Sequence, residues 1–161
     1  MPADFESSFD RLMLHEGGYT AGKGDPGGET RYGISKRSYP HLDIKTLTRA
    51  AAKEIYREDF WSRVNAEKLP DGVAFQLFDF AVNSGIETAV RYFQRSLNVA
   101  DDGHWGPISQ AAADGTTETD MIMNLAGERL DFMARLNNWP NAGRGWARRI
   151  AKNLRYGALD S

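Results

Sequence analysis

The chain has 161 residues, of which 41% are hydrophobic and 26% are charged, as is usual for one globular domain with a sizeable core. Its formal net charge of −2 gives no general attraction to nucleic acid, and the absence of cysteine excludes a disulfide scaffold and thiolate zinc sites. The histidines, His15, His41 and His104, lack the paired spacing of metal ligands, so we expect no metal and no cofactor.

Helical periodicity recurs along most of the sequence. The expected helices span residues 4–15, 47–60, 72–83, 86–98, 107–114, 117–137 and 143–156. A glycine-rich irregular stretch, 16–45, separates the first two and includes a possible short β-excursion at 30–34. The helix over 72–83 is so apolar that we expect it at the centre of the core, and Pro140 is expected to stop the helix before it. The sequence therefore predicts a mainly α single domain with a small irregular, β-containing lobe near residues 16–45.

Three polar residues of the irregular stretch suggest acid–base chemistry. Glu16 follows an apolar helix, where partial desolvation is expected to raise the pKa of its carboxyl and suit it to act as a general acid. Asp25 lies in a polar turn and should stay ionised, and Thr30 offers a hydroxyl that can hold a water. Two carboxyls in unlike environments are what glycoside hydrolysis requires. From composition alone, Glu16 could also be an exposed helix-end residue and Asp25 a turn-forming one.

The stretch HEGGYTAGKGDPGGETRYGIS resembles the signature of glycoside hydrolase family 108, which has the form E-G-G-Y followed by D-x-G-G-x-T-x-x-G-I. The order of Glu16, Asp25 and Thr30 is also similar to the Glu/Asp/Thr triad of phage-type lysozymes. The resemblance implies a lysozyme-like fold and N-acetylmuramidase activity. It further implies that Glu16 is the catalytic acid, and that Asp25 and Thr30 orient water or stabilise the transition state.

The segment FDFAVNSG, residues 78–85, resembles the central helix of the same family. Asn83 could contact a sugar N-acetyl or hydroxyl group, or it could simply end the helix before Gly85. Asp79 lies in so apolar a helix that we expect it to hydrogen-bond and position the active-site stretch.

Four other residues near the expected cleft could bind the sugar or tune the catalytic acid. The aromatic side chains of Tyr19, Tyr32 and Trp61 are candidate platforms for sugar rings, with Tyr32 preferred because a Trp at the position of Trp61 is more often part of a core. His15 could tune the pKa of Glu16 or could point away from it.

The second half of the chain is expected to form helices that pack against the first half. Residues 90–113 resemble the peptidoglycan-binding segment of the family, and they could bind glycan or merely complete the fold. We therefore expect a catalytic part at 1–88 and a peptidoglycan-binding-like helical part at 89–161, packed together. Residues 141–161 carry five basic side chains against one acidic, a net +4 that could attract an anionic envelope surface or could be the solvated face of a docked helix.

The expected function is that of a monomeric peptidoglycan hydrolase that cleaves the β-1,4 bond between N-acetylmuramic acid and N-acetylglucosamine and lyses bacterial cells. Its partners are peptidoglycan glycan strands. The acidic start, MPADFESSFDRLML, does not resemble a signal peptide. We expect a phage endolysin that collects in the host cytoplasm and reaches the periplasm and cell wall through a holin. The alternatives are a lytic transglycosylase, a chitinase, or a non-catalytic cell-wall-binding or secretion-accessory protein.

Overall fold

The computed structural model describes residues 4–15, 18–22 and 28–161. Glu16 and Asp25 lie outside the described residues. The α-helices are α1 (Phe5–His15), α2 (Arg49–Tyr56), α3 (Asp71–Ser84), α4 (Ile86–Ser96), α5 (Pro107–Asp114), α6 (Glu118–Ala134) and α7 (Trp139–Asp160). The strands are β1 (Thr30–Arg31) and β2 (Ile34–Ser35), and shorter helical turns cover Ile44–Thr46, Arg57–Trp61 and Ala66–Lys68. The mainly α fold with a small β-containing lobe is confirmed.

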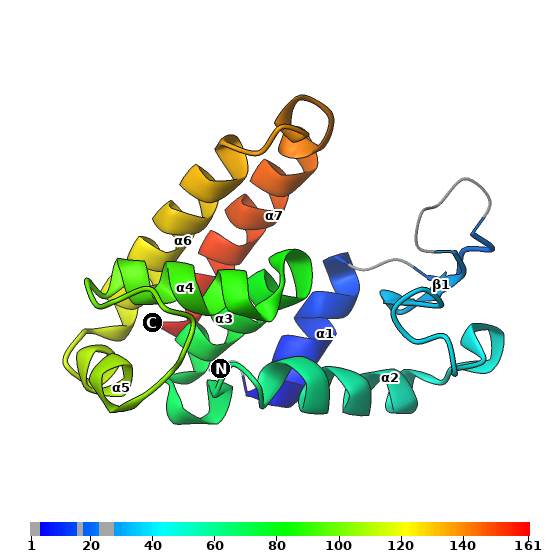
Figure 1. Ribbon diagram of the computed structural model, residues 1–161, viewed down its shortest axis with the longest axis horizontal. Coiled ribbons are helices and arrows are strands. Elements are labelled where there is room, and N and C mark those ends of the chain that lie inside the picture. Colours follow the sequence, from blue (N-terminus) through cyan, green and yellow to red (C-terminus); the bar gives the residue numbers. More distant parts are fainter. Residues whose placement is uncertain (1–3, 16–17, 23–27) are drawn as a thin grey trace.

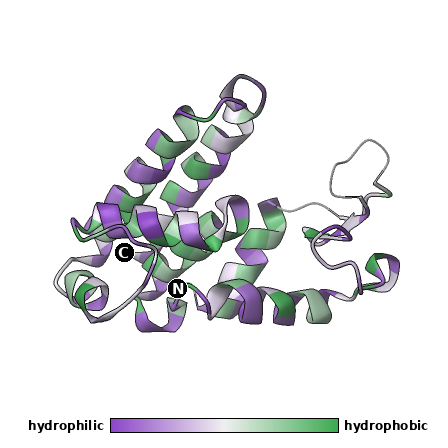
Figure 2. Ribbon diagram, viewed as in Figure 1, coloured by the Kyte–Doolittle hydropathy of each residue, from purple (hydrophilic) through white to green (hydrophobic). Residues whose placement is uncertain are grey.

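Helix α3 forms the centre of the molecule. Every residue from Gly72 to Ala81 is buried, because the helix is apolar on all sides and is surrounded by α1, α4, α6 and α7. Figure 1 shows α6 and α7 side by side as a hairpin that extends away from α3, while β1 lies at the opposite side of the molecule from α5. Hydrophobic and hydrophilic residues alternate along the surrounding helices (Figure 2), as expected where one face is buried.

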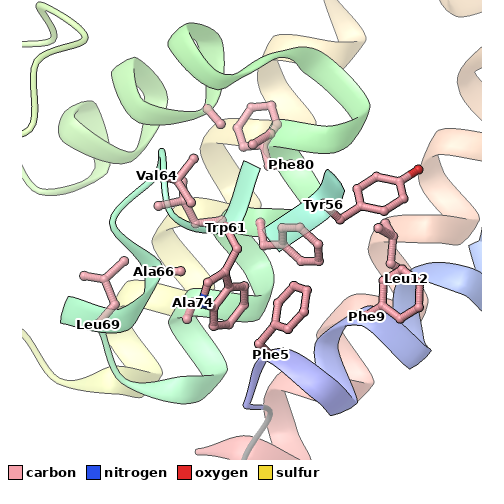
Figure 3. Packing of buried hydrophobic residues seen from close by; sticks show 14 of the residues in the cluster. Phe5, Phe9, Leu12, Tyr56, Trp61, Val64, Ala66, Leu69, Ala74 and Phe80 are labelled. Atoms are coloured by element: carbon pink, nitrogen blue, oxygen red, sulfur yellow. The ribbon is translucent and has the colours of Figure 1, made fainter. Parts of the chain in front are cut away.

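Aromatic rings fill the space between α1, α2 and α3 (Figure 3). Phe5 packs edge-on against Trp61, with ring centroids 5.3 Å apart, and Trp61 packs in the same way against Phe78 at 5.4 Å. Tyr56 meets Phe78 from another side at 6.3 Å. Such pairs add about 0.5–1.5 kcal/mol each beyond the burial of their area. They hold α1 against the helices on which the site depends.

Helix α7 is longer than the sequence predicted. It begins at Trp139, with Pro140 in its first turn, where the fixed φ of proline fits and the missing N–H costs nothing. At its other end the helix continues to Asp160, whose carboxylate accepts two hydrogen bonds from the Arg11 guanidinium at 2.7 and 2.9 Å. The expectation of a helix over 143–156 was therefore too short at both ends. Within the described residues, no helix is long and apolar enough to cross a membrane.

The small lobe is built around a tight antiparallel hairpin. Thr30 pairs with Ser35, and the turn between β1 and β2 places Tyr32 and Gly33 at φ 53° and 77°, as a type I′ turn requires. Thr20 forms a further bridge with Thr30. Gly22 has φ +84°, and a Cβ added there would lie 2.5 Å from the backbone carbon of Gly28. The backbones of Gly22 and Gly28 therefore lie against each other.

This close approach predicts that Gly22→Ala loosens the lobe. The substitution forces an L-residue into positive φ and a Cβ into neighbouring backbone, which should cost more than about 1 kcal/mol of local stability. Hydrogen exchange at the Thr20 and Thr30 amides, which are hydrogen-bonded to each other's carbonyls at 2.8 and 3.1 Å, should become faster. The matched control is Gly18→Ala, because a Cβ at Gly18 meets nothing within 4 Å. Equal exchange in both variants would contradict the prediction.

Candidate active site

A hollow of about 420 Å³ opens where α1 ends, beside the C-terminal end of α3 and one face of α7. Its lining residues are Leu14 and His15 from α1, Asn83 from α3, and Gly145, Trp146, Arg148, Arg149 and Lys152 from α7. His15 precedes Glu16 by one peptide bond. The hollow therefore adjoins the point where the chain enters the stretch that carries the expected catalytic residues.

Two residues of this lining, His15 and Arg149, lie against a buried carboxylate. Asp79 on α3 is fully buried and accepts hydrogen bonds from Arg129 on α6 at 2.8 Å, from Arg149 on α7 at 2.9 and 3.2 Å, and from the Asn153 amide at 2.6 Å. Burial alone would raise the pKa of the Asp79 carboxyl, but the guanidinium groups of Arg129 and Arg149 hold the pKa well below its ordinary value. Asp79 is therefore ionised and ties three helices together.

The same network fixes the ring of His15. Because the Asn153 amide nitrogen donates to Asp79, the Asn153 oxygen faces His15 and lies 3.0 Å from its Nε2. This nitrogen must then carry a proton and donate. Burial lowers the pKa of His15 more than Asp79, 3.9 Å away, and Asn153 raise it. His15 is therefore a neutral Nε2–H tautomer near pH 7, and its main contact is with α7.

Asn83 is oriented by the network as well. Its side-chain oxygen accepts a hydrogen bond from Arg129 at 3.2 Å. Among the described residues its amide nitrogen has no hydrogen-bond partner, and Asn83 lines the hollow. This arrangement leaves an N–H donor at the end of α3 that can reach a ligand.

A second hollow, of about 370 Å³, lies on the other side of the end of α3. It is lined by Gly33, Ile34, Ser35, Ser38, Tyr39, Tyr56, Asp59, Phe60 and Val82. The Tyr39 hydroxyl donates to Asp59 at 2.6 Å, and burial together with this carboxylate raises the pKa of Tyr39. Val82 and Asn83 are neighbours in α3, so both hollows adjoin one helix end, and the second hollow lies between the small lobe and the helical frame.

The described candidates in the lobe are mostly engaged with the lobe itself. The Thr30 hydroxyl donates to the Gly28 carbonyl at 3.3 Å. The Tyr19 hydroxyl donates to Glu29 at 2.7 Å, and the Arg31 guanidinium lies 5.1 Å from the Tyr19 ring. The Tyr32 carbonyl accepts from the Tyr56 hydroxyl at 2.7 Å, which fastens the hairpin turn to α2.

One residue that was expected to bind sugar, Trp61, is buried in the core. Trp61 is only 3% exposed and packs between Phe5 and Phe78, so its ring is part of the core and offers no face to a sugar. In the hollow at the end of α1, the half-buried aromatic of the lining is Trp146, which lies there together with Arg148 and Lys152. The sequence indicated only a basic segment over residues 141–161. It carried no local signal that this helix turns that part of its surface toward the end of α1.

The Asp-Gly turn of the segment 90–113 is held by one buried side chain. The Gln94 amide nitrogen donates to Asp102 Oδ1 at 3.2 Å, to the His104 carbonyl at 2.9 Å and to the Ser109 hydroxyl at 3.1 Å. Its oxygen accepts from the Gly103 N–H at 2.9 Å. These contacts give the turn a packing role, because they fasten the α4–α5 connection to α4.

The helical frame and the small lobe packed against it form a lysozyme-like fold. The structure is similar to that of Brucella abortus SagA, with a TM-score of 0.86 and 31% sequence identity over 97% of this chain and 95% of that chain. The family model described as Glycosyl hydrolase 108 matches residues 9–85. No curated protein matches the chain significantly.

The chain belongs to the glycosyl hydrolase 108 family, which confirms the resemblance found in the sequence. It is therefore a glycoside hydrolase, and its family indicates peptidoglycan hydrolase activity.

The buried network predicts a specific response to Asp79→Asn. The loss of the carboxylate leaves the buried guanidinium of Arg129 without its counter-charge and removes an ion pair from Arg149, which should lower the free energy of unfolding by about 3–5 kcal/mol. Because the folded pKa of Asp79 lies below its unfolded value of about 3.9, its contribution is complete above that pH and is lost as the pH falls further. The wild type should therefore lose stability in acid more steeply than Asp79→Asn.

Denaturant unfolding between pH 7 and pH 2 tests this prediction. The control is Asp131→Asn, which removes an exposed carboxylate 3.3 Å from Arg135 and should change stability by less than about 1 kcal/mol. Similar losses in the two variants at pH 7, or identical acid slopes in Asp79→Asn and the wild type, would show that the buried network does not have this role.

Proposed function

We propose that the protein is an N-acetylmuramidase that hydrolyses the β-1,4 bond between N-acetylmuramic acid and N-acetylglucosamine in peptidoglycan. In this mechanism Glu16 protonates the glycosidic oxygen as it leaves. Asp25, with the hydroxyl of Thr30, orients the attacking water or stabilises the positive charge of the oxocarbenium-like transition state. Lysis of bacterial cells, the endolysin role expected from the sequence, is the biological setting that we propose for this activity.

The main support is the family match over residues 9–85, since that span contains Glu16, Asp25 and Thr30 in the order that the signature requires. The surroundings are consistent with it. The chain enters the catalytic stretch directly from His15, whose ring is fastened to α7 through Asn153, so the helix that leads to Glu16 has a rigid end. Catalysis gains from such fixed positions, because small displacements of reacting groups cost large factors in rate.

Asn83 and the lobe aromatics are the proposed sugar contacts. The amide nitrogen of Asn83, which has no hydrogen-bond partner in the described part of the chain, can donate to a sugar N-acetyl carbonyl or hydroxyl. Tyr19 and Tyr32 are partly buried against the edge of the core and supply apolar surface for a sugar ring.

The first test is Glu16→Gln, which keeps the shape of the side chain and removes the acid. We expect hydrolysis of purified peptidoglycan to fall by about 10²- to 10⁴-fold, because that is the usual contribution of a general acid. Release of new reducing ends gives the rate, and mass spectrometry identifies which sugar carries them. Wild-type rates in a folded Glu16→Gln variant would refute the role of Glu16, and no release by the wild type would refute the hydrolase itself.

The second test is Asp25→Ala, which separates hydrolysis from a transglycosylase reaction that needs only one carboxylic acid. If Asp25 positions or activates water, the variant should lose at least about 10²-fold in rate while still binding peptidoglycan. The products of the wild type should carry hydrated reducing ends. Anhydro-sugar ends together with little loss in Asp25→Ala would instead favour a lytic transglycosylase.

A further inference from the structure

Two cations in the hollow at the end of α1 have no acidic partner among the residues that the structure describes. Arg148 is exposed and Lys152 is half-buried, and within the described parts of the chain neither makes a hydrogen bond or an ion pair. Their neighbour Arg149 differs, because it is paired with Asp79. Arg148 and Lys152 are four residues apart on α7, so their side chains share one helix face and their like charges repel. Placing these two positive charges side by side therefore lowers the stability of the helix.

The polar groups of Arg148, Lys152 and Asn83 that have no partner among the described residues are all hydrogen-bond donors. Arg148 and Lys152 have no acceptor atoms, and the oxygen of Asn83 is occupied by Arg129, which leaves its amide N–H. Leu14 and the half-buried ring of Trp146 supply apolar walls. The ligand that fits such a lining has anionic oxygens on a partly apolar stem, and a carboxylate matches cationic donors well.

Peptidoglycan carries groups of this kind beside the bond that the proposed function would cleave. Its muramic residues bear a lactyl ether, to which a peptide with free carboxylates is attached, while a plain N-acetylglucosamine polymer has no carboxylate at all. His15 lines the hollow and adjoins Glu16 in the chain, so a carboxylate in the hollow lies beside the catalytic stretch.

We propose that this hollow binds the carboxylates of the lactyl-peptide arm of peptidoglycan, and that Arg148 and Lys152 thereby select muramic-containing strands over neutral glycan. The inference rests on the proposed function for its substrate. It concerns binding, however, and can be tested where no turnover takes place. The charge of the basic helix α7 is then used at one defined site rather than as a general attraction to the envelope.

The test measures binding in the Glu16→Gln background, so that no substrate is consumed. The ligands are intact peptidoglycan, peptidoglycan stripped of peptide by an amidase so that the lactyl carboxylate remains, and chitin. Arg148→Gln with Lys152→Gln should weaken binding to intact peptidoglycan by about tenfold and leave binding to chitin unchanged. Gly145→Leu should also weaken it, because a side chain at Gly145 meets open space and would occupy the hollow.

The matched control is Arg155→Gln, which removes an exposed cation from the same helix outside the hollow. It should have no more than a small effect. Intact strands present only the carboxylates of the peptide, because the lactyl carboxyl is bound there in an amide. If the loss in the double variant persists on stripped strands, the hollow also accepts the lactyl carboxylate that the amidase frees. If the loss disappears there, the hollow binds the carboxylates of the peptide alone.

Four results would overturn the inference. Three are unchanged binding in the double variant, an equal loss on chitin, and an equal loss in Arg155→Gln. The fourth is normal binding in Gly145→Leu, because the ligand would then lie outside the hollow. These outcomes are independent of catalysis. If the wild type releases no reducing ends while the binding results hold, the proposed function fails and the carboxylate site stands.

Discussion

The buried carboxylate of Asp79 is the constraint on which the rest of the structure depends. A charge at the centre of an apolar helix is tolerated only when it is paired and hydrogen-bonded. The donors come from Arg129 on α6 and from Arg149 and Asn153 on α7. Helices α6 and α7 must therefore approach α3 at one level, and the hairpin that they form has one register relative to the core.

The partners of Asp79 also orient two side chains of the candidate site. Asn153 is oriented by its hydrogen bond to Asp79, and its oxygen in turn holds the ring of His15. Arg129, which also binds Asp79, holds the side chain of Asn83. One turn earlier on α1, Arg11 is held by Asp160 at the far end of α7. The last turn of α1 is thus fixed to α7 at two points. The lobe is fastened to the helical frame by the hydrogen bonds of the Tyr56 hydroxyl to Tyr32 and of the Tyr39 hydroxyl to Asp59, and by buried side chains such as Ile34.

Much of the helical frame could be predicted from the sequence, because the spacing of apolar residues reports directly on which face is buried. Helices α1, α3, α4 and α5 begin and end within two residues of the expected limits. The start of α7 was missed because proline breaks a helix in its interior but fits its first turn, and the sequence does not distinguish the two cases.

The site was less predictable for a different reason. The signature gave the family, but the hollow combines residues 14–15, 83 and 145–152, which no local pattern connects. Asp79 was expected to need partners, yet those it has lie 50, 70 and 74 residues away. Trp61 was misplaced among the sugar contacts because the burial of an aromatic ring depends on which helices meet over it.

The positions of the Asp79 donors along the sequence affect how the core can form during synthesis. Synthesis proceeds from the N-terminus, so α3 and its carboxylate exist well before the residues that neutralise it. Arg129 comes first, while Arg149 and Asn153 follow only on α7, and Asp160, the partner of Arg11, comes later still. A nascent chain that stops short of α7 holds a central helix whose charge lacks most of its donors. The assembly of the core is thus coupled to the synthesis of α7.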